Sequence, residues 1–160
     1  MVKYIITTIF MVLLSSSLSL ASTVVRGGSI GDGLDLSNIR VGEHTRYTRM
    51  VFHVNYSEGY GVELANTPAN ITGNYIFELD DTNLSIEATF SGFRSSSFEL
   101  KDINSTRVES MTPLLGEEYA DDSSLIYKIK LYKPSKIKAF ILYKPSRIIL
   151  DIFDAPIRVL

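Results

Sequence analysis

The chain carries the stretch TRMVFHV at residues 48–54 and a similar stretch, SRIILDI, at residues 146–152 near its opposite end. Each consists of a small hydroxyl residue, an arginine and an apolar run with one polar residue four places after the arginine. Successive side chains of a β-strand point to opposite faces, so each stretch is expected to be a strand with one wholly apolar face. That face must be buried, and the pair predicts a duplicated, two-sided β-domain.

The opposite face of each strand carries an arginine, an aliphatic residue and a titratable group in a row. We expect this face to point outward, because its polar groups lose hydration when buried. The residues on the two outer faces are Arg49, Val51, His53, Arg147, Ile149 and Asp151.

The rest of the chain also has the alternation of strands. Residues 84–90 and 125–132 alternate between two faces, and no segment beyond residue 21 has a helical period. The heptapeptide LYKPSKI at residues 131–137 recurs as LYKPSRI at residues 142–148. Each copy is expected to end one strand, turn at Pro-Ser and open the next, which predicts a three-strand meander. Short strands with Gly, Pro and Asn turns predict an all-β fold, a β-sandwich of two small sheets with internal quasi-symmetry.

Four segments are expected to lie outside regular strands or to contribute little to them. The sequence predicts a turn at residues 91–97, one or two short strands at residues 98–108, and the longest irregular segment at residues 112–124. Residues 22–36 (STVVRGGSIGDGLDL) are rich in glycine and predict a flexible leader. The sandwich domain is then expected to span residues 37–156.

The N-terminus has the pattern of a secretory signal peptide. Lys3 precedes an apolar run at residues 4–14, and Ser-Leu-Ala at residues 19–21 fits a cleavage site before Ser22. A transmembrane anchor is the alternative, but such anchors need about 20 mostly apolar residues, and serines interrupt this run. We therefore expect residues 1–21 to be removed and the protein to be secreted to the periplasm.

The composition restricts the chemistry. The 160 residues include no cysteine, which excludes disulfides and thiol catalysis, and only two histidines. A net charge of −2 gives no basic excess for nucleic acid. No nucleophile elbow, phosphate-binding loop or dinucleotide motif is present. The sequence therefore predicts a protein that is not an enzyme and holds neither a metal ion nor a cofactor.

The two strand arginines have two interpretations, both left open by the sequence. Arg49 and Arg147 could cover apolar surface with their stems while their heads stay in water or pair with a carboxylate. Asp151 lies about 13 Å along the strand from Arg147 at ~3.3 Å per residue, too far for easy pairing. Both guanidinium groups are therefore expected to face neighbouring strands or a ligand, whose carboxylate or sugar oxygens suit their fork of donors.

Two motifs at opposite ends of the chain resemble those of AMIN domains. IRVGEH at residues 39–44, followed by TRMVF at residues 48–52, is similar to the opening of that family. FIL at residues 140–142, followed by PSRIILDI at residues 145–152, is similar to its closing strand. The resemblance frames nearly all of the chain after the signal peptide.

The resemblance implies a periplasmic β-sandwich that localises envelope proteins by binding peptidoglycan or docking at sites of cell-wall work and secretion. Arg49 and Arg147 are the main expected ligand contacts, with Arg40 and Asp151 as further contacts. His53 stands where the family usually has aspartate. We therefore expect the first outer face to bind less well, or differently at mildly acidic pH, because imidazole titrates near neutrality.

These observations lead to two main hypotheses. The first is a non-catalytic periplasmic protein that binds the glycan or stem peptide of peptidoglycan and does not span the membrane after signal cleavage. The alternative is a protein–protein adaptor of a secretin, a type IV pilus or a division complex. A small hydrolase is a third class, disfavoured because no catalytic constellation is recognisable.

Overall fold

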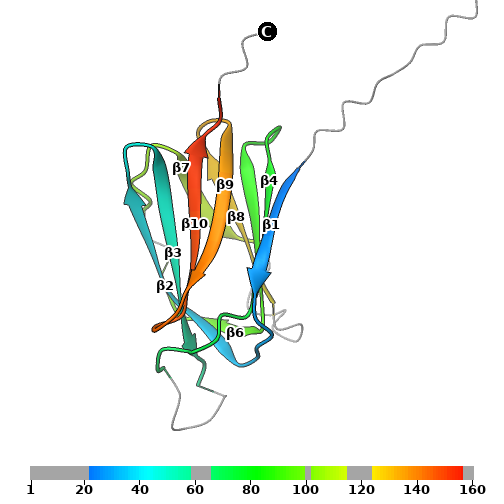
Figure 1. The fold of residues 1–160 in the computed structure, drawn as a ribbon, viewed down its shortest axis with the longest axis vertical. Coiled ribbons are helices and arrows are strands. Elements are labelled where there is room, and N and C mark those ends of the chain that lie inside the picture. Colours follow the sequence, from blue (N-terminus) through cyan, green and yellow to red (C-terminus); the bar gives the residue numbers. More distant parts are fainter. Residues whose placement is uncertain (1–21, 59–65, 100–101, 115–123, 157–160) are drawn as a thin grey trace, which may run out of the picture.

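The computed structural model describes residues 22–58, 66–99, 102–114 and 124–156. In this part of the chain two five-stranded sheets pack face to face as a β-sandwich (Figure 1), so the predicted all-β sandwich is confirmed. Sheet A has the order β1-β4-β5-β8-β7, and sheet B has the order β6-β2-β3-β10-β9. The strands are β1 (Thr23–Gly28), β2 (Leu34–Glu43), β3 (Tyr47–Tyr56), β4 (Asn74–Asp80), β5 (Ser85–Ser91), β6 (Phe93–Ser96), β7 (Val108–Pro113), β8 (Ser124–Leu131), β9 (Ser135–Leu142) and β10 (Arg147–Asp154).

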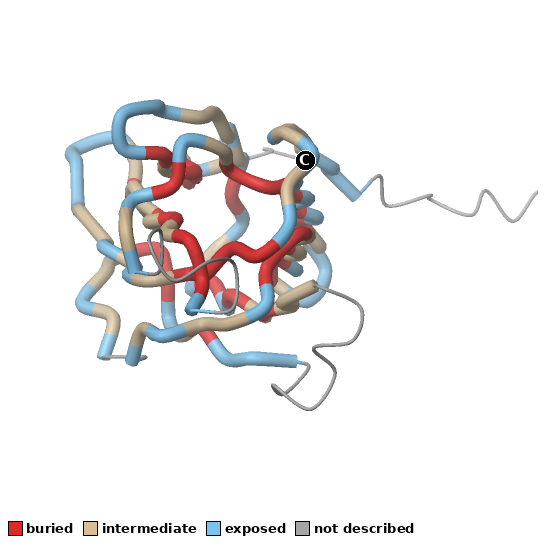
Figure 2. The backbone as a smooth tube through the Cα atoms, turned by 90° about the horizontal axis from the view of Figure 1, so that it is seen from below, coloured by how far each residue is buried: buried red, intermediate tan, exposed pale blue. Residues whose placement is uncertain are grey.

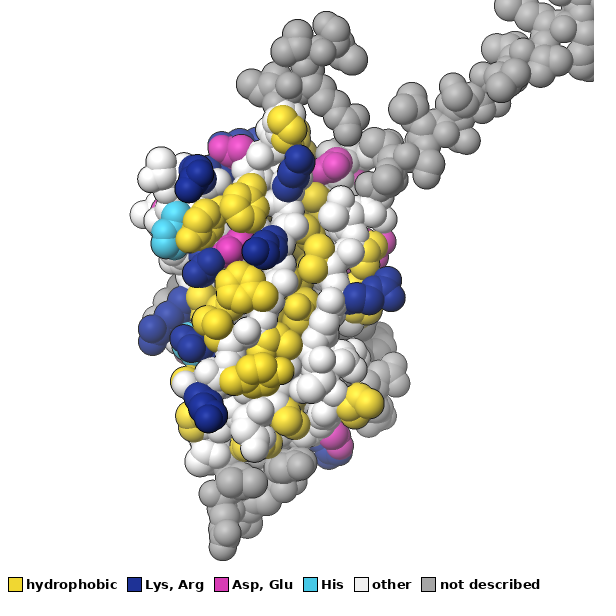
Figure 3. Space-filling model, in the orientation of Figure 1, with side chains coloured by type: hydrophobic (Ala, Val, Ile, Leu, Met, Phe, Trp, Pro, Cys, Tyr) yellow, Lys and Arg dark blue, Asp and Glu magenta, His cyan; other side chains and the backbone are white. Residues whose placement is uncertain are grey.

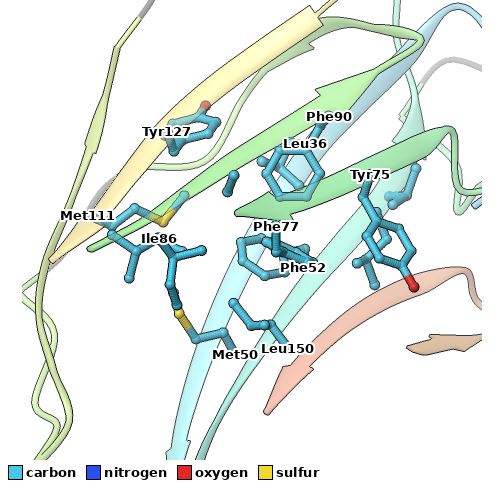
Figure 4. Close-up of a cluster of buried hydrophobic side chains, with 14 of the residues drawn as sticks. Leu36, Met50, Phe52, Tyr75, Phe77, Ile86, Phe90, Met111, Tyr127 and Leu150 are labelled. Atoms are coloured by element: carbon cyan, nitrogen blue, oxygen red, sulfur yellow. The ribbon is translucent and has the colours of Figure 1, made fainter. Parts of the chain in front are cut away.

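The core fills the space between the two sheets, as the buried inner parts of the tube in Figure 2 indicate. Met50 and Phe52 lie on the inner face of β3 and are fully buried, and Leu150 is fully buried on the inner face of β10. Figure 4 shows these side chains meeting aromatic residues from the other sheet. Phe52 lies with its ring centroid 5.8 Å from Phe77 and 5.0 Å from Phe90. The predicted inner faces of both matched strands are therefore confirmed.

A bulge keeps the apolar face of β2 turned inward. Leu34 and Leu36 are fully buried at the start of the strand, and the pairing with β3 shifts between Leu36 and Asn38. The shift adds one residue before Ile39, which then packs against the core. A bulge inserts one unpaired residue and disrupts the ladder only locally, so apolar residues spaced by two and then by three positions still lie on a single face.

Residues 22–36 are not a flexible leader, and this prediction was wrong. β1 pairs antiparallel with β4 as an edge strand of sheet A, and it lies beside β9 of sheet B (Figure 1). Glycines provide the turn between β1 and β2, since Gly28 and Gly33 have φ values of 109° and 68°. Glycine adopts positive φ without steric cost, so in this segment it marks a tight connection between strands.

The three-strand meander predicted from the repeated heptapeptide is also wrong. β8 lies in sheet A between β5 and β7, whereas β9 and β10 form a hairpin in sheet B. The first copy of the heptapeptide thus carries the chain from one sheet to the other, and only the second copy closes a hairpin. Both edges of β8 are already paired, so β9 has no free edge beside it in sheet A.

Two strands lie where the sequence predicted something else. β6 occupies Phe93–Ser96 in the expected turn and pairs parallel with β2. The buried carboxylate of Asp35 fixes it by accepting hydrogen bonds from Ser95 Oγ at 2.7 Å and from the Ser97 backbone at 3.0 Å. β7 begins only at Val108. Of the expected irregular segment, residues 112 and 113 belong to β7, and residues 115–123 lie outside the described residues.

The signal-peptide prediction for residues 1–21 falls outside the described part of the chain. Within the part that is described, no helix has the length and apolar character needed to cross a membrane.

Candidate binding surface on the outer face of sheet B

One side of the sandwich combines apolar and basic side chains outside the core. Figure 3 shows hydrophobic side chains gathered along the face formed by β3, β10 and β9, with Lys and Arg side chains around them. Strand alternation and register assign the members of this surface, which we call the outer face of sheet B. They are Arg40, Tyr47, Arg49, Val51, His53, Lys136, Lys138, Phe140, Leu142, Arg147, Ile149, Asp151 and Phe153.

The pairing of the two matched strands organises this face. β3 and β10 are antiparallel neighbours, with Val51 opposite Ile149 at the centre of the pair. Antiparallel pairing of two similar sequences places equivalent residues around a local two-fold axis. Arg49 consequently stands opposite Asp151 on one side of the centre. His53 and Arg147 face each other on the other side.

Arg49 is held by an ion pair inside the protein. Its Nε lies 2.7 Å from Asp151 Oδ1 and its Nη2 lies 2.8 Å from Oδ2, a bidentate arrangement. The guanidinium carbon lies 5.2 Å from the Tyr47 ring centroid and 5.3 Å from that of Phe140. The hydrogen bonds that Arg49 donates to Asp151 raise the pKa of Arg49 further above its ordinary value, against an opposing effect of burial. Arg49 therefore has a structural role, which was one of its two interpretations.

Asp151 is almost fully buried, with 6% of its side chain exposed, whereas 31% of the Arg49 side chain remains exposed. The carboxylate is thus committed to the arginine and offers little to a ligand, while the arginine still presents part of its surface. Ile149 is also buried, at 1% exposure, although it lies on the outer face. It is flanked in the register by Val51 and Phe140, so this face has an apolar layer of its own.

On the other side of the β3–β10 centre, the described residues form no ion pair. Arg147 stands opposite His53, and the partner of His53 on β2 is the uncharged Asn38. Arg147 Nε donates a hydrogen bond to the backbone oxygen of Pro145 at 3.2 Å. Burial, followed by the positive charges of Arg40 and Arg147, lowers the pKa of His53. The structure therefore brings Arg40, His53 and Arg147 together as one cationic group.

The sequence reasoning missed the contribution of β9 to this surface. Lys136, Lys138, Phe140 and Leu142 alternate with inward residues and lie on the same outer face. The alternation was visible in the sequence, but which face pointed outward depended on the pairing of β9 with β10. The side chain of Lys138 lies over the Phe140 ring, with Nζ 5.9 Å from its centroid.

Sequence reasoning also missed a buried arginine that joins distant segments. Arg107, at 4% exposure, donates from Nε and Nη2 to the Asp154 carboxylate at 2.9 and 3.0 Å, and from Nη1 to Glu43 at 3.3 Å. Glu43 also accepts a hydrogen bond from Thr48 Oγ1 at 2.7 Å. Burial alone raises the pKa of Glu43, but hydrogen bonds, first from Ser105 and Thr48, outweigh it and lower the value. These contacts tie the ends of β2 and β10 to the start of β7, which is a structural role.

Two depressions lie away from this face. A groove of about 520 Å³ runs beside β2 and has Ile39, Phe98 and Met111 in its lining. A depression of about 390 Å³ on sheet A is lined by acidic residues, among them Glu78 and Glu87. Among the described residues no group of three or more His, Cys, Asp or Glu side chains is arranged to hold a metal ion.

No family model, curated protein or solved structure matches this chain. The resemblance to AMIN domains therefore stays a hypothesis based on the sequence motifs, and function must be argued from the surface itself.

Proposed function

We propose that this chain is a secreted, non-catalytic AMIN-like protein of the periplasm that binds peptidoglycan through the outer face of sheet B. One observation carries the proposal: apolar side chains, including the rings of Tyr47, Phe140 and Phe153, lie among basic side chains on a sheet face outside the core. Apolar surface that a fold leaves outside its core often marks an interaction site.

The chemistry of this face matches both components of the cell wall. Sugar rings have apolar faces that stack on aromatic rings, and stem peptides carry carboxylates that arginine and lysine bind. Arg49, fixed by Asp151 between two rings, provides a rigid centre with part of its guanidinium exposed. An extended polymer suits an open sheet face, whereas small ligands usually require a concave pocket.

The sequence motifs support the cellular part of the proposal. The signal-peptide pattern at residues 1–21 fits export, and the motifs at residues 39–52 and 140–152 resemble those of a periplasmic localisation family. We also propose, as part of the resemblance to AMIN domains, that the whole domain has internal quasi-symmetry.

A pull-down with purified peptidoglycan sacculi tests the proposal. The protein should be enriched over a denatured control, and Lys138→Glu should weaken binding because it places a negative charge among the cations of the outer face. Lys130→Glu is the matched control, since Lys130 is also an exposed strand lysine but lies on sheet A. Absence of enrichment, or an equal loss in both variants, would contradict the proposal.

A second pair of variants tests the apolar part of the same face. Leu142 on β9 is 38% exposed and Ile76 on β4 of sheet A is 37% exposed, so their replacement by asparagine removes similar exposed surface. Only Leu142→Asn should reduce sacculus binding. Release of soluble muropeptides from the sacculi would instead identify a hydrolase.

The adaptor function is the second candidate, and the exposed apolar surface beyond the end of β9 favours it. Tyr143, at 57% exposure, continues the surface past Leu142 into the turn before β10. Aromatic side chains of this kind are enriched in protein interfaces. If sacculi are not bound, and cross-linking in cells captures an envelope protein in a manner that Leu142→Asn abolishes, the adaptor function is supported.

A further inference from the structure

The β3–β10 pair has two equivalent positions with different occupants. On one side of the central pair, Asp151 neutralises Arg49 with two short hydrogen bonds. On the other side, the position opposite Arg147 is taken by His53, which provides no negative charge to a guanidinium. The same strand geometry thus places one arginine opposite a carboxylate and the other opposite a histidine.

The described residues supply no substitute for the missing carboxylate. Neither Arg40 nor Arg147 forms an ion pair with the described part of the chain. Arg147 uses one donor, Nε, for the backbone oxygen of Pro145, which leaves the other nitrogens of its fork without a described protein partner. An arginine fork in this state can receive two oxygens of a carboxylate.

His53 adds a second unsatisfied group at the same place. The imidazole is half-buried, and its Nε2 is buried without a hydrogen-bond partner. A buried polar atom without a partner costs free energy, which a bound oxygen would recover. The charged groups beside the ring are Arg40 on β2 and Arg147 on β10, the two strands that flank β3.

We propose that Arg147, Arg40 and His53 form an anion-binding subsite that receives a carboxylate of the ligand, the group that Asp151 supplies to Arg49 within the protein. The source of this carboxylate rests on the proposed function, because the stem peptides of peptidoglycan carry free carboxylates. The subsite itself depends only on the three side chains and their missing counter-charge.

Ligand binding at this subsite is coupled to protonation of His53. Burial, followed by the charges of the two arginines, lowers the pKa of the free imidazole below its ordinary value and so favours the neutral ring at pH 7. A bound carboxylate offsets the arginine charges and favours the imidazolium, so the pKa of His53 rises when ligand binds. By linkage, affinity increases as the pH falls toward the pKa of His53.

A titration with two peptide probes tests the subsite. A stem tetrapeptide with free carboxylates should shift the imidazole NMR signals of His53 and raise its pKa, whereas the same peptide with its carboxylates esterified should do neither. An equal response to both peptides would overturn the proposal, as would binding of the tetrapeptide without any change at His53.

Two substitutions then locate the site. His53→Asp places a carboxylate opposite Arg147, so that Arg147 gains an ion-pair partner within the protein. Tetrapeptide affinity should then fall at least about 10-fold without a decrease in Tm. Arg147→Gln should weaken binding to a similar extent, while Lys130→Gln on sheet A should leave it unchanged. Unchanged affinity in a folded His53→Asp or Arg147→Gln protein would overturn the proposal.

Sacculus binding separates this inference from the function on which it rests. If wild-type protein and His53→Asp bind sacculi equally well, the subsite is refuted and the wall-binding function stands. If wild-type protein does not bind sacculi but the free tetrapeptide still titrates His53, the wall-binding function is refuted and the subsite stands.

Discussion

Replacing Phe52 by alanine removes a ring from the centre of the sandwich. Phe52 lies on β3 of sheet B and is fully buried. Its ring centroid is 5.0 Å from that of Phe90 and 5.8 Å from that of Phe77, and both neighbours belong to sheet A. The substitution therefore leaves a cavity at the contact between the two sheets, which the surrounding strands can fill only in part.

The expected cost follows from burial and cavity formation. Phe→Ala in a core lowers the free energy of unfolding by about 3–5 kcal/mol. Domains are stable by about 5–15 kcal/mol, so the Phe52→Ala protein should still fold in water. With a urea dependence of about 1–3 kcal/mol per M, the midpoint should fall by about 2 M.

Urea unfolding followed by far-UV circular dichroism measures this change, and Val51→Ala is the matched control. Val51 is adjacent on the same strand but points to the outer face, so its truncation should cost about 1 kcal/mol. A larger loss of stability in Val51→Ala than in Phe52→Ala would refute the assignment of faces, since a shift of one residue exchanges the two faces of a strand.

Three further outcomes follow from the contacts. Ile149→Ala should cost about 2–4 kcal/mol in the same assay, although Ile149 is on the outer face, because it is 1% exposed; a cost below 1 kcal/mol would contradict this. Arg107→Met should lower Tm much more than Arg94→Met, because Arg107 is buried whereas the ion pair of Arg94 is half-exposed; equal shifts would contradict a structural role. Hydrogen bonds from Lys133 and Arg107 lower the pKa of Asp154. This contribution to stability is present above about pH 4 and is lost as the pH falls through the lower folded value, so Tm should depend less on pH below 4 in Arg107→Met than in wild-type protein.

The faces of single strands were predictable from the sequence because they depend on local alternation. Residues 48–54 and 146–152 showed which side chains are buried, and the structure agrees at Phe52 and Leu150. Sheet membership was not predictable in this way. β8 lies beside β5 and β7 because of contacts between distant segments, which the repeated heptapeptide at residues 131–137 does not encode.

The partner of each arginine was likewise set by strand pairing. Within one strand Asp151 is too far from Arg147, and no motif indicated that β3 and β10 are neighbours. Their register brings Asp151 to Arg49, a pair separated by 102 residues in the chain. The buried role of Arg107 was missed for the same reason, since its partner Asp154 is 47 residues away.

One residue accounts for the difference between the two halves of the outer face of sheet B. The strands, their pairing and the central Val51–Ile149 contact are common to both halves. Where the residue opposite an arginine is Asp151, the guanidinium pairs with it within the protein and joins β3 to β10. Where it is His53, the facing Arg147 has no counter-charge within the part of the chain that the structure describes, and in our proposal a ligand supplies it. In this proposal the strand pair uses arginine for stability in one half and for binding in the other, so His53→Asp should remove binding in the second half without loss of the fold.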